Sequence, residues 1–66
     1  MKAIFLSLPD FNGEVKELAT RFYNSMPVFY YRQRVKLNKT WYVINSVDID
    51  LDQNVLLVEL LEAQEW

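Results

Sequence analysis

The fold is decided by the longest alternating stretch of the chain, WYVINSVDIDL at residues 41–51. Successive side chains of a β-strand point to opposite faces of a sheet, so this period of two predicts one long strand. The face that we expect to be buried carries Trp41, Val43, Val47, Ile49 and Leu51. The opposite face would carry Tyr42, Ile44, Ser46, Asp48, Asp50 and Asp52. Asn45 interrupts the apolar face.

Further strands are predicted on both sides of this stretch and near the N-terminus. They are residues 2–8, 28–37 and 55–61, which show the same alternation. A three-residue loop at residues 38–40 would place Gln33 opposite Asn45, where the two amides can hydrogen-bond. A two-residue turn at residues 53–54 would then join the last two strands.

The segment between Pro9 and Pro27 has a different period. Its apolar residues recur at steps of three and four, at Val15, Leu18, Ala19, Phe22, Tyr23 and Met26. This spacing predicts an amphipathic helix that lies on one face of the sheet. We therefore expect an α+β fold with the order β-α-β-β-β and an antiparallel sheet of about four strands. The alternative is an SH3-like, partly closed barrel with one helix. A chain of 66 residues allows only a single domain, residues 1–66.

The outward face of this predicted sheet is apolar where a water-exposed face would be polar. It would carry Tyr30, Tyr42, Ile44, Val55, Leu57 and Leu61. One helix cannot cover both faces of a sheet, so something else must close the second face. The sheet curls into a small barrel, two copies pack as a homodimer, or a foreign protein docks there. We favour the homodimer or the foreign partner.

Charge is unevenly distributed along the chain, although the net charge is only −2. Residues 1–39 hold all seven cations and three acids, whereas residues 40–66 hold six acids and no cation. The simpler interpretation is that cations of the strand at 28–37 pair with acids of neighbouring strands. The alternative interpretation is two surface patches for different partners.

Several kinds of chemistry are excluded by composition. The chain has no Cys and no His, which removes disulfides, the usual nucleophile dyads and ordinary zinc sites. A single Gly rules out a glycine-rich phosphate loop. A domain of this size also has little room for a catalytic cleft. We therefore expect no enzyme, no cofactor and no metal.

The acidic run at residues 48–59 resembles a calcium-binding loop only in spacing. Asp48, Asp50, Asp52, Asn54 and Glu59 stand at the ligand positions of an EF-hand, but Gln53 replaces the glycine of the sharp turn. Strand alternation explains the same residues without a metal. The predicted register would also set the two carboxylates of Asp48 and Glu59 opposite each other, which is unfavourable.

By exclusion, the sequence predicts a small non-enzymatic protein-interaction module, such as an adaptor, an inhibitor or a regulatory subunit. Its partner would be another protein or a second copy, bound through the outward sheet face. The predicted contact residues are Tyr30, Arg32, Arg34, Tyr42, Ile44, Asp48, Asp50, Leu57, Glu59 and Leu61. Tyrosine and arginine are common anchors of protein interfaces.

Two other functions stay open as alternatives. Tyr30 and Tyr31 precede the cations of the strand at 28–37, a combination with which sheets bind single-stranded nucleic acid. The acids Asp48, Asp50 and Asp52 would project from one side of a strand and imitate phosphates as a decoy. No motif is specific enough to indicate a family.

The sequence favours a cytoplasmic protein that has no contact with a membrane. The apolar stretch at residues 3–8 is shorter than the core of a signal peptide, and no stretch is long enough to span a bilayer. The absence of Cys suits a reducing compartment. The terminal Trp66 would be either docked on the domain or available to a partner.

Overall fold

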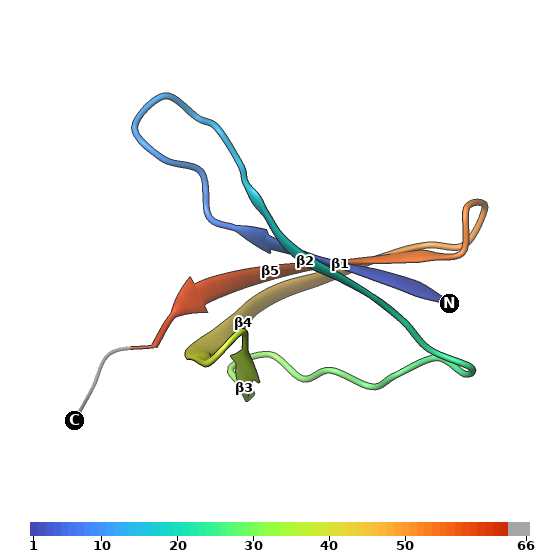
Figure 1. Ribbon diagram of the computed structural model, residues 1–66. Coiled ribbons are helices and arrows are strands. Elements are labelled where there is room, and N and C mark those ends of the chain that lie inside the picture. Colours follow the sequence, from blue (N-terminus) through green and yellow to red (C-terminus); the bar gives the residue numbers. More distant parts are fainter. Residues whose placement is uncertain (64–66) are drawn as a thin grey trace.

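The computed structural model describes residues 1–63, which form one sheet of five strands (Figure 1). The strands are β1 (Lys2–Ser7), β2 (Glu17–Phe22), β3 (Arg34–Leu37), β4 (Thr40–Asp50) and β5 (Val55–Glu62). Their order across the sheet is β2-β1-β5-β4-β3. β1 runs parallel to β5, and all other neighbours are antiparallel. The tail with Trp66 lies outside the described residues.

No helix occurs in residues 1–63, so the α+β prediction and its barrel-with-a-helix alternative are both wrong. The fold is all-β. The segment predicted to be helical contains β2, and half of its apolar stripe is exposed. The exposed fractions are 46% for Val15, 78% for Phe22 and 47% for Met26. The apolar spacing alone did not decide this segment, because pairing with β2 satisfies the backbone groups along the side of β1 that faces away from β5.

Hydrogen bonds hold the β1–β2 hairpin at both ends. The amino group of Met1 donates to the carbonyl of Tyr23 (2.6 Å), and the Tyr23 N–H donates to the carbonyl of Met1 (2.8 Å). At the opposite end, the Ser7 N–H donates to the carbonyl of Lys16 (2.8 Å), and the Lys16 N–H donates to Ser7 Oγ (2.9 Å). These bonds hold the chain between Lys16 and Tyr23 extended beside β1.

The turn between β3 and β4 contains two residues, where we had predicted three. Asn38 and Lys39 both have positive φ angles, 51° and 69°, as a two-residue hairpin turn with matching twist requires. Thr40 consequently pairs with Leu37, and Trp41 pairs with Lys36. A register shift of one residue turns each side chain to the other face, so the predicted hairpin partners are wrong. The strand predicted at residues 28–37 is also reduced to β3.

β4 changes phase at Asn45. The β4–β5 register shifts between Ile44 and Ser46, which leaves Asn45 as a bulge. Before the bulge Ile44 faces the core, and after it Val47 does so; Ile49 lies on the same side but is 50% exposed, although the sequence predicted it to be buried. Asn45 therefore does not meet Gln33; its Nδ2 donates to Glu59 Oε1 (2.6 Å). The polar interruption of the strand marks the place where the buried face switches.

The turn between β4 and β5 is longer than predicted. It spans residues 51–54, and Asp50 pairs with Val55 across it. One carboxylate oxygen of Asp50 accepts hydrogen bonds from the N–H groups of Asp52 and Gln53, each at 3.1 Å. Asn54 has a positive φ of 60°, which asparagine tolerates. The two-residue turn at 53–54 was therefore wrong.

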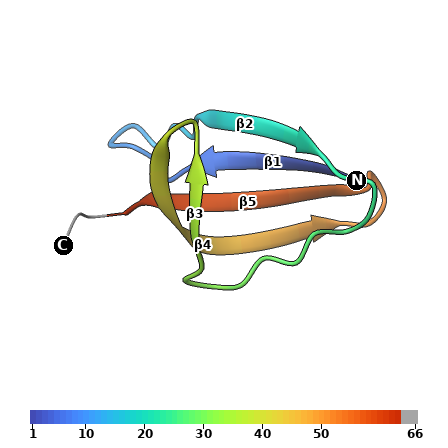
Figure 2. The same cartoon turned by 60° about the horizontal axis from the view of Figure 1, so that its bottom comes forward.

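The sheet curls into a half-barrel whose inner face is the core. β4 bends, and it carries β3 across the front of the sheet, as Figure 2 shows. The buried core residues are Ala3, Phe5, Leu37, Ile44, Leu56, Val58 and Leu60. Phe29 packs edge-on against Phe5 with ring centroids 5.7 Å apart. The chain before β3 and β3 itself thus close the inner face without a helix.

Candidate functional site

The outer face of the sheet is the side turned away from the core, and it is apolar at its centre. In Figure 1, β3 and the chain before it lie on one side of the sheet, and the opposite side is this outer face. Besides tryptophan, strand register places seven apolar side chains on the outer face: Ile4, Leu6, Phe22, Val43, Val55, Leu57 and Leu61. All seven are half-buried or exposed, whereas the residues that alternate with them in β1 and β5 point inward and are buried.

A basic and aromatic cluster lies at one end of the outer face. Trp41 of β4 is 47% exposed, and its register partner is Lys36 of β3. The guanidinium carbon of Arg34 lies 5.0 Å from the Trp41 ring centroid, and Lys36 Nζ lies 5.9 Å from it. These are cation–π distances. The indole is therefore flanked by two cations and still offers about half of its surface to a partner.

An acidic end lies at the far end of β4. Asp48 is exposed and pairs with Leu57, and Asp50 is half-buried and pairs with Val55. Asp48 lies seven residues beyond Trp41, which is roughly 23 Å along a strand. The direct cross-strand partners of Arg34 and Lys36 are Val43 and Trp41, so the register sets no acid of β4 opposite these cations. Along β3 and β4, cations and the two aspartates occupy opposite ends of the face.

The structure divides the ten predicted contact residues between several locations. Six lie on the outer face: Arg34, Asp48, Asp50, Leu57, Glu59 and Leu61. Tyr30 and Arg32 precede β3 and are exposed. Tyr42 and Ile44 belong to the inner face, where Ile44 is 0% exposed. The prediction that Tyr42 and Ile44 face outward was wrong, because the register and the bulge exchange the faces of this half of β4.

The acidic side chains of β4 and β5 are also placed differently from the sequence prediction. Glu59 pairs with Ser46 and accepts a hydrogen bond from Asn45, so it does not oppose Asp48. Asp52 lies in the turn after β4, so the predicted row of three acids on one strand does not form. Within residues 1–63, no group of three or more acidic side chains is arranged to hold a metal ion.

Sequence reasoning missed the apolar and aromatic members of the site. Trp41 and Val43 were assigned to the core, and Phe22 was assigned to a helix. The signal that would have found Trp41 is the pair Asn38-Lys39, because asparagine favours a two-residue turn with positive φ angles. Such a turn makes Thr40, not Trp41, the partner of Leu37 and so turns the indole outward.

Comparisons with known proteins add no relative. No family model, no curated protein and no solved structure matches the chain. Among residues 1–63 there is also no helix of the length and apolar character that a membrane span requires.

Proposed function

We propose that this protein is a non-enzymatic protein-interaction module and that the outer face of its sheet is the interface. The observation that carries the proposal is the exposed Trp41 between two cations at the rim of a continuous apolar face. Tryptophan and arginine dominate the energetic centres of protein interfaces. Seven apolar side chains that no element of the described chain covers would gain from burial by a partner. A cytoplasmic location, which the absence of Cys suits, is part of the same proposal.

The partner that fits this face best is a second copy of the chain. In a two-fold dimer the same patch of both copies forms the interface. If one residue contacts a second residue of the partner, the second residue therefore also contacts the first one of the partner. Along β3 and β4, the outer face carries cations at one end and acids at the other, whereas Glu59 lies between them and Lys2 of β1 lies near the acidic end. Two copies packed face to face in opposite directions would set Lys36 against Asp48 and apolar centre against apolar centre. The charges along β3 and β4 are thus self-complementary.

Sedimentation velocity on two charge-reversed variants tests the proposal. Lys36→Glu would place an acid beside Arg34 at the basic end, and Asp48→Lys would place a cation beside Asp50 at the acidic end. Each variant alone should associate about threefold to tenfold more weakly than the wild type, because each dimer holds two such exposed contacts. An equimolar mixture of the two should restore association as a heterodimer. A wild-type protein that stays monomeric at all concentrations, or a mixture that stays dissociated, would contradict the second copy as partner.

Binding of single-stranded nucleic acid is a second candidate that one observation favours. Tyr30 and Tyr31 are 66% and 67% exposed, and the Arg32 guanidinium lies 5.3 Å from the Tyr31 ring centroid. Exposed rings beside cations stack bases and neutralise phosphates. A labelled single strand should then bind less tightly as salt increases, and Tyr31→Ala should weaken it. Binding that is absent, or insensitive to salt, would remove this candidate.

A further inference from the structure

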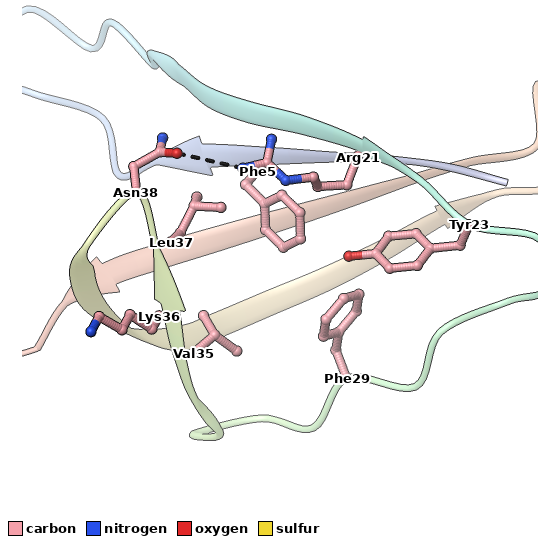
Figure 3. A pocket seen from close by; sticks show the side chains of 8 residues that line it. All are labelled: Phe5, Arg21, Tyr23, Phe29, Val35, Lys36, Leu37 and Asn38. Atoms are coloured by element: carbon pink, nitrogen blue, oxygen red, sulfur yellow. Dashed lines mark hydrogen bonds between the residues drawn. The ribbon is translucent and has the colours of Figure 1, made fainter.

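The curl of the sheet leaves an open pocket between β2 and β3, on the inner side of the half-barrel. Its volume is about 230 Å³, and Figure 3 shows the residues that line it. Its apolar wall consists of Phe5, Phe29, Val35 and Leu37. The two phenylalanine rings meet edge-on at an interplanar angle of 85°, and the Tyr23 ring makes a second edge contact with Phe29, with ring centroids 6.4 Å apart. This wall suits a flat aromatic group.

Two polar groups of β2 and its continuation accompany this wall. Arg21 and Tyr23 lie two residues apart in extended chain, so they point to the same side. The Tyr23 hydroxyl points into the space between Phe5 and Phe29 in Figure 3. Tyr23 is half-buried, and within the described chain its hydroxyl has no hydrogen-bond partner. A hydroxyl held in this way is available to donate to a ligand.

Arg21 supplies the positive charge at the rim of the pocket. Its guanidinium donates to the Thr20 carbonyl (3.1 Å) and to Asn38 Oδ1 (3.4 Å), and both acceptors are neutral. Among residues 1–63, no Asp or Glu lines the pocket. The other cationic lining residue, Lys36, turns its amine away from the pocket, toward Trp41. Arg21 therefore presents an uncompensated charge that an anion can meet with charge-assisted hydrogen bonds.

We infer that this pocket binds a small aromatic carboxylate. The ring would lie against Phe5 and Phe29, and the carboxylate would accept hydrogen bonds from the Arg21 guanidinium and the Tyr23 hydroxyl. Size supports a single ring with a short acidic substituent, because an apolar cavity of about 150 Å³ holds one benzene molecule. The site is separate from the outer face, so it does not depend on the proposed dimer.

The test is a titration of the isotope-labelled protein followed by NMR, with benzoate as the probe and benzamide as its neutral counterpart. Benzoate should shift the backbone signals of Arg21, Tyr23, Phe29 and Leu37, with a Kd on the order of 10 mM or tighter for a ligand of this size. Benzamide should bind about tenfold more weakly, because its neutral carbonyl lacks the negative charge that pairs with the guanidinium. Equal binding of the two probes, or shifts elsewhere in the chain, would overturn the inference.

Three variants locate the effect. Arg21→Gln should remove the preference for benzoate over benzamide, and Tyr23→Phe should weaken benzoate without altering the charge. Lys16→Gln removes a cation from the loop before β2, outside the pocket, and should leave both affinities unchanged. The NMR spectrum of each variant without ligand shows whether the variant is folded. If Arg21→Gln does not fold, the benzoate affinity of Tyr23→Phe tests the inference. Loss of benzoate binding in Lys16→Gln to the same extent as in Arg21→Gln would show that only net charge matters.

Discussion

Lys39 holds a backbone conformation that is unfavourable for a residue with a Cβ atom. Its φ is 69°, in the left-handed region, and it is the second residue of the β3–β4 turn. Left-handed backbone costs a non-glycine residue roughly 1–2 kcal/mol, and asparagine followed by glycine is the preferred sequence of such a turn. The turn matters beyond its own stability, because its length sets which side chains of β4 face outward.

Replacement of Lys39 by glycine should therefore stabilise the protein. We expect Lys39→Gly to raise the free energy of unfolding by about 1 kcal/mol, measured by urea denaturation. Lys39→Ala is the matched control, because it removes the same charge and leaves the strain. If the alanine variant gains as much as the glycine variant, the gain comes from the charge, and the two-residue turn described here is contradicted.

Asn45 shows how one residue changes which side chains of a strand face the core. Sequence alternation treats it as a polar fault in an apolar face, whereas the structure uses it as a bulge and bonds its amide to Glu59. A bulge adds one residue to one strand, so the two halves of β4 present opposite phases of the same pattern. Trp41 and Ile44 were consequently assigned to each other's faces.

At the scale of elements, β5 gives the clearest test of which face is buried. Leu56 is 1% exposed and lies inside, and its neighbour Leu57 is half-buried on the outer face. Leu56→Ala should cost about 2–5 kcal/mol, which is comparable to the whole stability of so small a domain. Leu57→Ala removes the same atoms from a half-buried site. It should lower the free energy of unfolding clearly less, when measured at protein concentrations too low for two copies to associate. Equal losses in chemical denaturation would contradict the face assignment.

The strands with strict alternation were predictable, and the rest was not. β1, β4 and β5 lie within a residue or two of the predicted segments, because their alternation is regular. β2 was not predictable, since its apolar spacing fits a helix. Its strand conformation follows only from its hydrogen bonds to β1. The predicted strand registers were wrong because they depend on the lengths of the turns. Those lengths are set by positive φ angles at Asn38, Lys39 and Asn54, which the alternation of the strands does not reveal. The predicted contact residues lie on the outer face only where these register errors did not turn their side chains to the other side of the sheet.

At the scale of the whole molecule, one small sheet has two apolar faces, and residues 1–63 cover one of them. The inner face is enclosed by the curl of β4, by β3 and by the chain before β3 (Figure 2). Along β3 and β4, the outer face has a basic and an acidic end, which a second copy in the opposite direction would complement. We expect this outer face to become buried when two copies meet.

The most direct measurement is the accessibility of methyl groups to a soluble paramagnetic probe, followed by NMR at low and high protein concentration. The methyl groups of Ile4, Leu57 and Leu61 should lose most of their probe-induced relaxation as concentration increases, because the partner covers them. Leu51, which is 77% exposed in the β4–β5 turn, is the internal control and should stay accessible. Outer-face methyl groups that relax equally at both concentrations would contradict the claim.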